Sequence, residues 1–127
     1  MSDQANKSAR EQNAMHKILI AVPSNIGDNL AKTVVMANTA CLRALSNAKG
    51  SDRKSFEKDG CALVVVSVLD TPDIEKIEYN AKKNGLNACA LSAGDCGLHG
   101  DQKVAAVGPH DEAMFNKLSA NLRLFGR

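Results

Sequence analysis

Apolar and polar positions divide the chain, from residue 16 onward, into segments with the periods of strands and helices. The first apolar run, residues 18–22, is short and rich in β-branched side chains, which is typical of a strand buried on both faces. A polar loop, residues 24–29, follows Pro23. Beyond the loop, apolar residues recur every three or four positions, as in one stripe of an amphipathic helix: Leu30, Val34, Ala37, Cys41 and Leu45.

This strand-loop-helix corner is the first place to expect a ligand site. Such a corner places backbone N–H groups and the positive end of the helix dipole at the carboxyl edge of the sheet. Ligands of open α/β sheets usually bind at that edge. The alternative is that the polar residues of loop 24–29 only cap the helix.

The middle of the chain predicts a second strand and a second helix. Residues 46–60 are interpreted as a solvated connection anchored by Phe56. Its basic side chains either contact phosphates or keep the loop soluble, and they are Lys49, Arg53, Lys54 and Lys58. Residues 61–69 contain a continuous apolar run of the kind that parallel sheets bury. A helix begins at Thr71-Pro72 and ends near Gly85, with its buried side formed by Ile74, Ile77 and Ala81.

The last third predicts two strands and a final helix. Residues 86–91 and 103–107 are the strands, and Gly108-Pro109 is expected to stop the second one. No helical stripe fits in loop 92–102, so the last strand should return antiparallel. The final helix buries Met114, Phe115, Leu118 and Leu122.

These elements predict an α/β fold with the order β-α-β-α-β-β-α. The expected architecture is a three-layer α/β/α sandwich around a mixed four-stranded sheet whose last strand is antiparallel. Residues 1–15 carry almost no large apolar side chain and are predicted to be a disordered tail. Residues 16–127 then form a single domain.

Composition narrows the classes of function. Aromatic residues make up only 3% of the chain, which argues against stacking platforms for single-stranded nucleic acid. The net charge of +2 is too balanced to indicate nucleic acid by itself, so an RNA ligand would need local clusters of basic residues.

The four cysteines show no C-x-x-C spacing, and no secretory or membrane-length apolar segment precedes them. We therefore predict a cytoplasmic protein without a membrane partner. Cys41, Cys61 and Cys89 fall in apolar patterns and are expected to be small buried hydrophobes, whereas Cys96 lies in a loop.

In order and in spacing, these segments resemble the type II peptidyl-tRNA hydrolases from His16 to the C-terminus. The resemblance rests on a series of short motifs in the second half of the chain: Gly60 before Val64-Val65-Val66, Ala81-Lys82 with Gly85-Leu86, Ala93-Gly94, Val107-Gly108-Pro109, and Lys117 with Leu122-Arg123-Leu124-Phe125. It implies a compact α/β/α sandwich, often dimeric, that hydrolyses the ester joining a nascent peptide to tRNA.

The active-site motifs of that family are only partly retained. Its Gly-Lys-Gly-Lys corresponds here to Asn29-Leu30-Ala31-Lys32, so only Lys32 survives, and its Gln-Cys-x-His corresponds to Met36-Ala37-Asn38-Thr39. Its Asp-Ala-Gly becomes Ser92-Ala93-Gly94, its next Thr-Gln becomes Cys96-Gly97, and Val22-Pro23 replaces the usual Arg. The pattern is that of a divergent branch lacking most of the usual motif.

The resemblance places the site between the first helix and loop 92–102. The predicted catalytic residues are Lys32, Ser92, Asp95 and Cys96, and the predicted ligand-binding residues are Ser24, Asn25, Asn38, Thr39, His99 and Lys103. Cys96 with His99 and a carboxylate is also a candidate for covalent catalysis or for a metal site, although a fourth metal ligand is missing. Solvated turn residues are the alternative interpretation, and we predict no metal and no cofactor.

Three hypotheses follow. The first is a divergent peptidyl-tRNA hydrolase or related esterase. The second is a non-catalytic protein that binds tRNA or another phosphate-bearing anion. The third is a homodimeric module for protein interaction.

Overall fold

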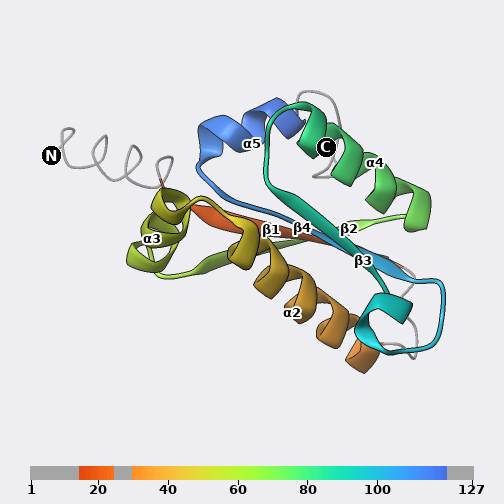
Figure 1. Cartoon of the computed structure of the whole chain (residues 1–127). Helices are drawn as coiled ribbons and strands as arrows, with labels where there is room; N and C mark the ends of the chain where they lie inside the picture. The colour runs from red at the N-terminus through yellow and green to blue at the C-terminus, as the bar shows by residue number, and fades with distance from the viewer. Residues whose placement is uncertain (1–14, 25–29, 120–127) are drawn as a thin grey trace, which may run out of the picture.

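The fold is a four-stranded mixed sheet with helices on both faces (Figure 1). The computed structural model describes residues 15–24 and 30–119. The sheet has the order β2-β1-β4-β3, with β1 at Lys17–Pro23, β2 at Ala62–Val68, β3 at Ala88–Ser92 and β4 at Lys103–His110. β1 and β2 are parallel, and β4 runs antiparallel to both β1 and β3. The predicted α/β class, the mixed sheet and the antiparallel last strand are confirmed.

Each face of the sheet has its own apolar core. α2 (Leu30–Asn47) and α3 (Gly50–Lys58) lie on one face, and α4 (Thr71–Lys83) and α5 (Glu112–Ser119) lie on the other (Figure 1). Met36 of α2 and Phe56 of α3 pack on one side of the sheet, while Ile74, Ile77 and Phe115 pack on the other. Alternating residues of β1 and β4 contribute to the two cores because successive side chains of a strand point to opposite faces.

The interpretation of residues 46–60 as a solvated connection was wrong, because α3 forms within them. This helix has only one buried residue, Phe56, so no apolar stripe announces it. Polar contacts hold it instead: Arg53 Nε donates to the Leu45 carbonyl at 3.2 Å, and His16 Nε2 lies 3.1 Å from Asp52 Oδ1. The prediction that Phe56 is the buried anchor is confirmed.

The predicted apolar stripe of α2 was one position out of register. The buried residues are Thr33, Met36, Ala40 and Ala44, whereas Leu30 and Val34 are exposed. Small residues such as Ala40 and Ala44 let the backbone of α2 approach the sheet closely. The helix face that carries the larger side chains Leu30 and Val34 is therefore not the face that packs on the sheet.

Two strand boundaries also differ from the prediction. β4 continues through Gly108 and Pro109 to His110, because Gly108 adopts φ +118° and the pairing with β1 shifts its register there. β3 begins at Ala88 rather than at residue 86.

The apolar run of β2, an edge strand, is buried on one face only, because α2 and α3 pack over the other strands. Cys61, just before it, is exposed at φ +58°, contrary to the expected buried position. Cys41 and Cys89 are half-buried, and burial raises the pKa of both thiols.

α4 begins and ends as predicted. A capping box between Asp70 and Asp73 spans Pro72, and Gly85 at φ +78° follows the last turn. Residues 1–14 of the predicted tail 1–15, loop residues 25–29 and Leu122 lie outside the described residues. In the described part of the chain, no helix combines the length and the hydropathy needed to span a bilayer.

Candidate functional site

The ends of four strands define the rim where the sequence predicts a site. The carboxyl ends of β1, β2 and β3 lie at one end of the sheet together with the start of β4, since Pro23 pairs with Val68 and Ser92 pairs with Lys103. The backbone N–H of Ser24 donates to the Val68 carbonyl at 2.6 Å, which fixes the exit of β1 at this rim.

Lys32 lies against the loop between β3 and β4. Its ammonium, in the first turn of α2, donates to the backbone carbonyl of His99. A Cβ atom built on Gly100 would lie 3.0 Å from Lys32 Nζ, so the ammonium contacts the loop closely. The structure therefore brings the first helix and loop 92–102 together at one rim.

Two further polar residues were not singled out by the sequence: Gln102, close to Lys32, and Thr33, on the buried face of α2. The Gln102 side-chain oxygen also lies close to the position that a Cβ atom on Gly100 would occupy. This buried oxygen has no hydrogen-bond partner among the described residues. The buried Thr33 hydroxyl is also without a partner in the described part of the chain. Thr33 was missed because it occupies a core position of α2, and Gln102 because it was counted only as loop.

Ser92 and Asp95 hold each other in a tight turn. The Ser92 N–H donates to Asp95 Oδ2 at 2.9 Å, and the Asp95 N–H donates to Ser92 Oγ at 3.2 Å. The hydrogen bonds from Ser92 lower the pKa of the Asp95 carboxyl, although its side chain is exposed. Asp95 is therefore an ionised turn residue that orders the start of the loop.

Cys96 and His99 lie in the same loop but face different surroundings. Cys96 ends the short 3-10 helix η2 (Gly94–Cys96), is half-buried and packs against the apolar core under α2. His99 is exposed, and its backbone carbonyl is the acceptor of the Lys32 ammonium. No hydrogen bond joins the Cys96 thiol to the His99 ring among the described contacts.

The remaining predicted ligand-binding residues are dispersed. Thr39 Oγ1 donates to the Val35 carbonyl at 2.9 Å within α2, and Asn38 is exposed on that helix. Lys103 forms an ion pair with Glu75 of α4 at 3.0 Å, so it faces the side of the sheet opposite to α2. Asn25 lies outside the described residues.

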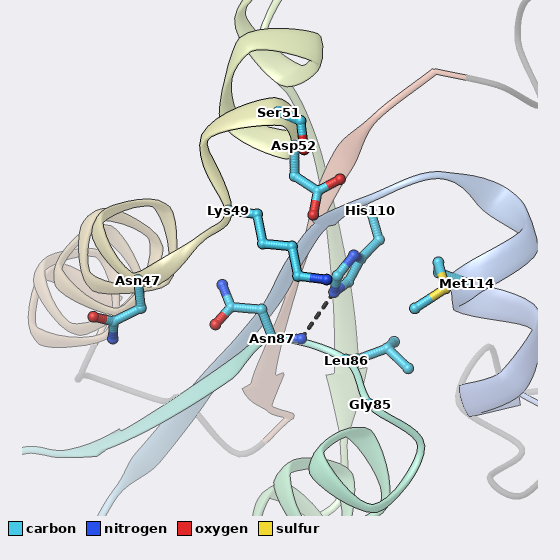
Figure 2. Close-up of a pocket in the computed structure, with 9 residues that line it drawn as sticks. All are labelled: Asn47, Lys49, Ser51, Asp52, Gly85, Leu86, Asn87, His110 and Met114. Carbon is cyan, nitrogen blue, oxygen red and sulfur yellow. Dashed lines mark hydrogen bonds between the residues drawn. The ribbon is translucent and has the colours of Figure 1, made fainter.

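A second concave region lies at the opposite end of the sheet (Figure 2). This cavity of about 440 Å³ lies between the end of α2, the start of α3, the turn before β3, and α5. It is lined by Asn47, Lys49, Ser51, Asp52, Gly85, Leu86, Asn87, His110 and Met114. The sequence did not predict it, because its residues come from distant segments and the helix α3 was not foreseen.

Asn87 and His110 form the floor of this cavity. The Asn87 N–H donates to His110 Nε2 at 2.8 Å, and Asn87 Nδ2 donates to the carbonyls of Ala44 and Gly108 at 2.7 Å each. Burial lowers the pKa of the His110 imidazole. With Nε2 accepting a hydrogen bond, the neutral ring carries its proton on Nδ1, so His110 is a structural acceptor rather than a free base.

The chemistry available at the Lys32 rim is that of a cation close to a side-chain amide oxygen. An ammonium can bind a phosphate or stabilise a developing oxyanion, and neighbouring polar groups can orient a water molecule. Within residues 15–24 and 30–119, no cluster of three or more His, Cys, Asp or Glu side chains could hold a metal ion.

Comparison with known proteins identifies the family. No curated protein matched the chain. The family model described as peptidyl-tRNA hydrolase PTH2 matches residues 16–125, which include every described helix and strand. The chain therefore belongs to the peptidyl-tRNA hydrolase PTH2 family.

Proposed function

We propose that this protein is a divergent peptidyl-tRNA hydrolase that cleaves the ester of peptidyl-tRNA or a related ester at the rim containing Lys32. The family match supports the reaction class. The observation that supports the place is the Lys32 ammonium held against the His99 carbonyl at the carboxyl ends of the parallel strands.

Lys32 is the proposed electrostatic residue of this site. Its charge would bind a tRNA phosphate or the oxyanion that forms when water attacks the ester carbonyl. The unpartnered Gln102 oxygen, close to the ammonium, can accept a hydrogen bond from that water or from a ribose hydroxyl. Ser92, Asp95 and Cys96 then shape the loop that faces the substrate.

A second candidate function is tRNA binding without turnover. The specific observation in its favour is that Asp95, the carboxylate of the predicted catalytic set, is already bound by Ser92. A carboxylate held in this way with a lowered pKa is a poor general base. In this case Lys32 would contact phosphate only, and binding would weaken steeply with salt.

The test is hydrolysis of N-acetylated aminoacyl-tRNA by the purified protein. We expect ester loss with the wild type and about a 100-fold lower rate with Lys32→Ala, the size of effect seen when one oxyanion donor is removed. Lys83→Ala, at an exposed lysine in the last turn of α4 on the opposite face of the sheet, is the matched control and should keep the full rate.

The Cys96→Ala variant distinguishes a thiolate mechanism from activation of water at Lys32. A thiolate mechanism predicts that this variant is inactive, whereas water activation at Lys32 predicts that it retains most of the rate. Salt-sensitive tRNA binding with no ester loss by the wild type would overturn hydrolysis in favour of binding, and the absence of both would overturn both.

The proposal also covers the cellular compartment and the oligomeric state. We infer a cytoplasmic protein, because all four cysteines are free thiols in the described structure. We also propose a homodimer, as the family resemblance implies, with no membrane partner.

A further inference from the structure

The cavity of Figure 2 has no part in the proposed hydrolysis, because it lies at the end of the sheet opposite to the proposed ester site. Its volume of about 440 Å³ falls within the range of small-molecule sites. The side chains of Lys49, Asp52 and His110 extend toward one another, while Leu86 and Met114 lie on the other side (Figure 2). Charged or polar groups and apolar groups therefore occupy separate parts of the wall.

The imidazole of His110 presents an unpartnered N–H to this cavity. The residue is only 6% exposed, and its Nε2 accepts the Asn87 N–H, so the proton of the neutral ring is on Nδ1. Among the described residues, no group accepts a hydrogen bond from Nδ1. Because a buried donor without an acceptor costs free energy, a ligand that supplies an acceptor at this point gains affinity.

The start of the nine-residue helix α3 adds further donors. The Arg53 N–H donates to the Lys49 carbonyl at 3.0 Å, so the N–H groups of residues 50–52 have no acceptor within the helix. Lys49 is the N-cap and forms no side-chain cap, and its ammonium contributes to the lowered pKa of His110. A cation, N–H donors and the positive end of a helix dipole together suit a carboxylate.

The Asp52 carboxylate argues against a simple anion as the ligand. It lines the same cavity, and its Oδ1 lies 3.1 Å from His16 Nε2, while Oδ2 has no hydrogen-bond partner among the described residues. The other nearby acid, Asp111, already accepts the Met114 N–H at 3.0 Å. Asp52 would repel an anion in the cavity, and Lys49 would repel a cation. A ligand that carries both charges matches both side chains.

We propose that this cavity binds a free α-amino acid with an apolar side chain. The carboxylate of the amino acid lies between the Lys49 ammonium, the His110 Nδ1–H and the start of α3, and its ammonium lies at Asp52 Oδ2. Its side chain packs against Leu86 and Met114. The inference goes beyond the proposed hydrolysis and does not depend on it, because no residue of the cavity belongs to the ester site.

The test is a titration of the isotope-labelled full chain with leucine, followed through the NMR signals of the Ser51 and Asn87 amides. We expect saturable shifts with leucine. Leucinamide, which lacks the carboxylate, and isocaproate, which lacks the ammonium, should each bind about tenfold more weakly or worse. Glycine should also bind more weakly, because it offers no side chain to Leu86 and Met114. No saturable shift with leucine, or equally tight binding of isocaproate, would overturn the proposal.

Two substitutions that remove a charge assign the two ends of the ligand. Lys49→Gln should weaken leucine binding about tenfold and abolish its advantage over leucinamide, and Asp52→Asn should abolish its advantage over isocaproate. The amide that replaces the Asp52 carboxylate can still accept a hydrogen bond from His16. Lys54→Gln and Glu57→Gln are the matched controls, since both residues are exposed on α3 outside the cavity, and they should bind leucine like the wild type.

Unchanged leucine binding by both Lys49→Gln and Asp52→Asn would place the amino acid elsewhere and overturn the proposal. All of these titrations are made without tRNA. Leucine binding and ester hydrolysis can therefore fail independently, and each result bears on its own proposal.

Discussion

The His110 imidazole is held in its neutral form by its surroundings. It is buried at the end of β4, accepts the Asn87 N–H, and packs edge-on against Phe115 with ring centroids 6.0 Å apart. Burial is the main cause of its lowered pKa, the charge of Asp52 acts in the opposite direction, and His16, Asp111 and Lys49 contribute less. Protonation of this ring would therefore cost free energy in the folded state only.

This asymmetry predicts that the folded state loses stability as the pH falls. The unfolded chain binds a proton near the ordinary histidine pKa of 6.5, while the folded chain binds it only at lower pH. The unfolding free energy should therefore fall from about pH 6.5 down to the lowered pKa of His110. Urea unfolding at about pH 7.5, 6.5 and 5.5 measures this slope. His110→Asn should flatten it, since the amide oxygen can still accept the Asn87 N–H, and an equal slope in both proteins would contradict the assignment.

The sequence identified some site residues and could not identify others. Lys32 was predicted from a family motif, and the structure places it beside the predicted loop. Gln102 was not singled out, because its closeness to Lys32 depends on the path of the loop through Gly100, where φ is +121°. Sequence shows which polar residues a loop contains, but the direction of each side chain depends on backbone angles that spacing does not reveal.

At the scale of elements, the spacing of apolar residues predicted the helix that packing against the sheet stabilises. α4 was predicted because Ile74, Ile77 and Ala81 share one face and Thr71-Pro72 marks the start of a helix. α3 was not predicted, because side-chain bonds to carbonyls and to His16 hold it rather than a buried stripe. β4 was cut short at Gly108-Pro109, since these residues usually end a strand, yet tertiary pairing with β1 carries β4 to His110.

The junction of β1 and β4 depends on the missing side chain of Gly108. A Cβ atom there would lie 2.7 Å from the Lys17 carbonyl oxygen, and the φ of +118° is unfavourable for any other residue. We expect Gly108→Ala to lower the unfolding free energy by about 2–4 kcal/mol. Gly50→Ala is the control, because a Cβ at the start of α3 meets nothing within 4 Å, and it should be neutral or stabilising by up to about 1 kcal/mol. Equal effects in urea unfolding would refute the role of Gly108.

For the whole molecule, the layer arrangement was predictable because alternation of strands and helices leaves few ways to bury both faces of a sheet. The continuous apolar run that follows β1 in the sequence forms β2, and the order β2-β1-β4-β3 places this strand at an edge of the sheet. Apolar content alone does not indicate an edge position. A run of this kind predicts burial, and in the single chain β2 is buried on one side only. Leu63 and Val65 therefore remain exposed at this edge.

If two copies unfold as they separate, the melting temperature must depend on protein concentration. A tenfold increase in concentration stabilises a dimer by about 1.4 kcal/mol, or about half of this per chain, which corresponds to roughly 2–4 °C for a domain of this size. We expect this rise for the wild type, because we propose that it is a homodimer, and scanning calorimetry over two decades of concentration measures it. A wild-type melting temperature that is constant over that range would show that the proposed homodimer does not stabilise the fold.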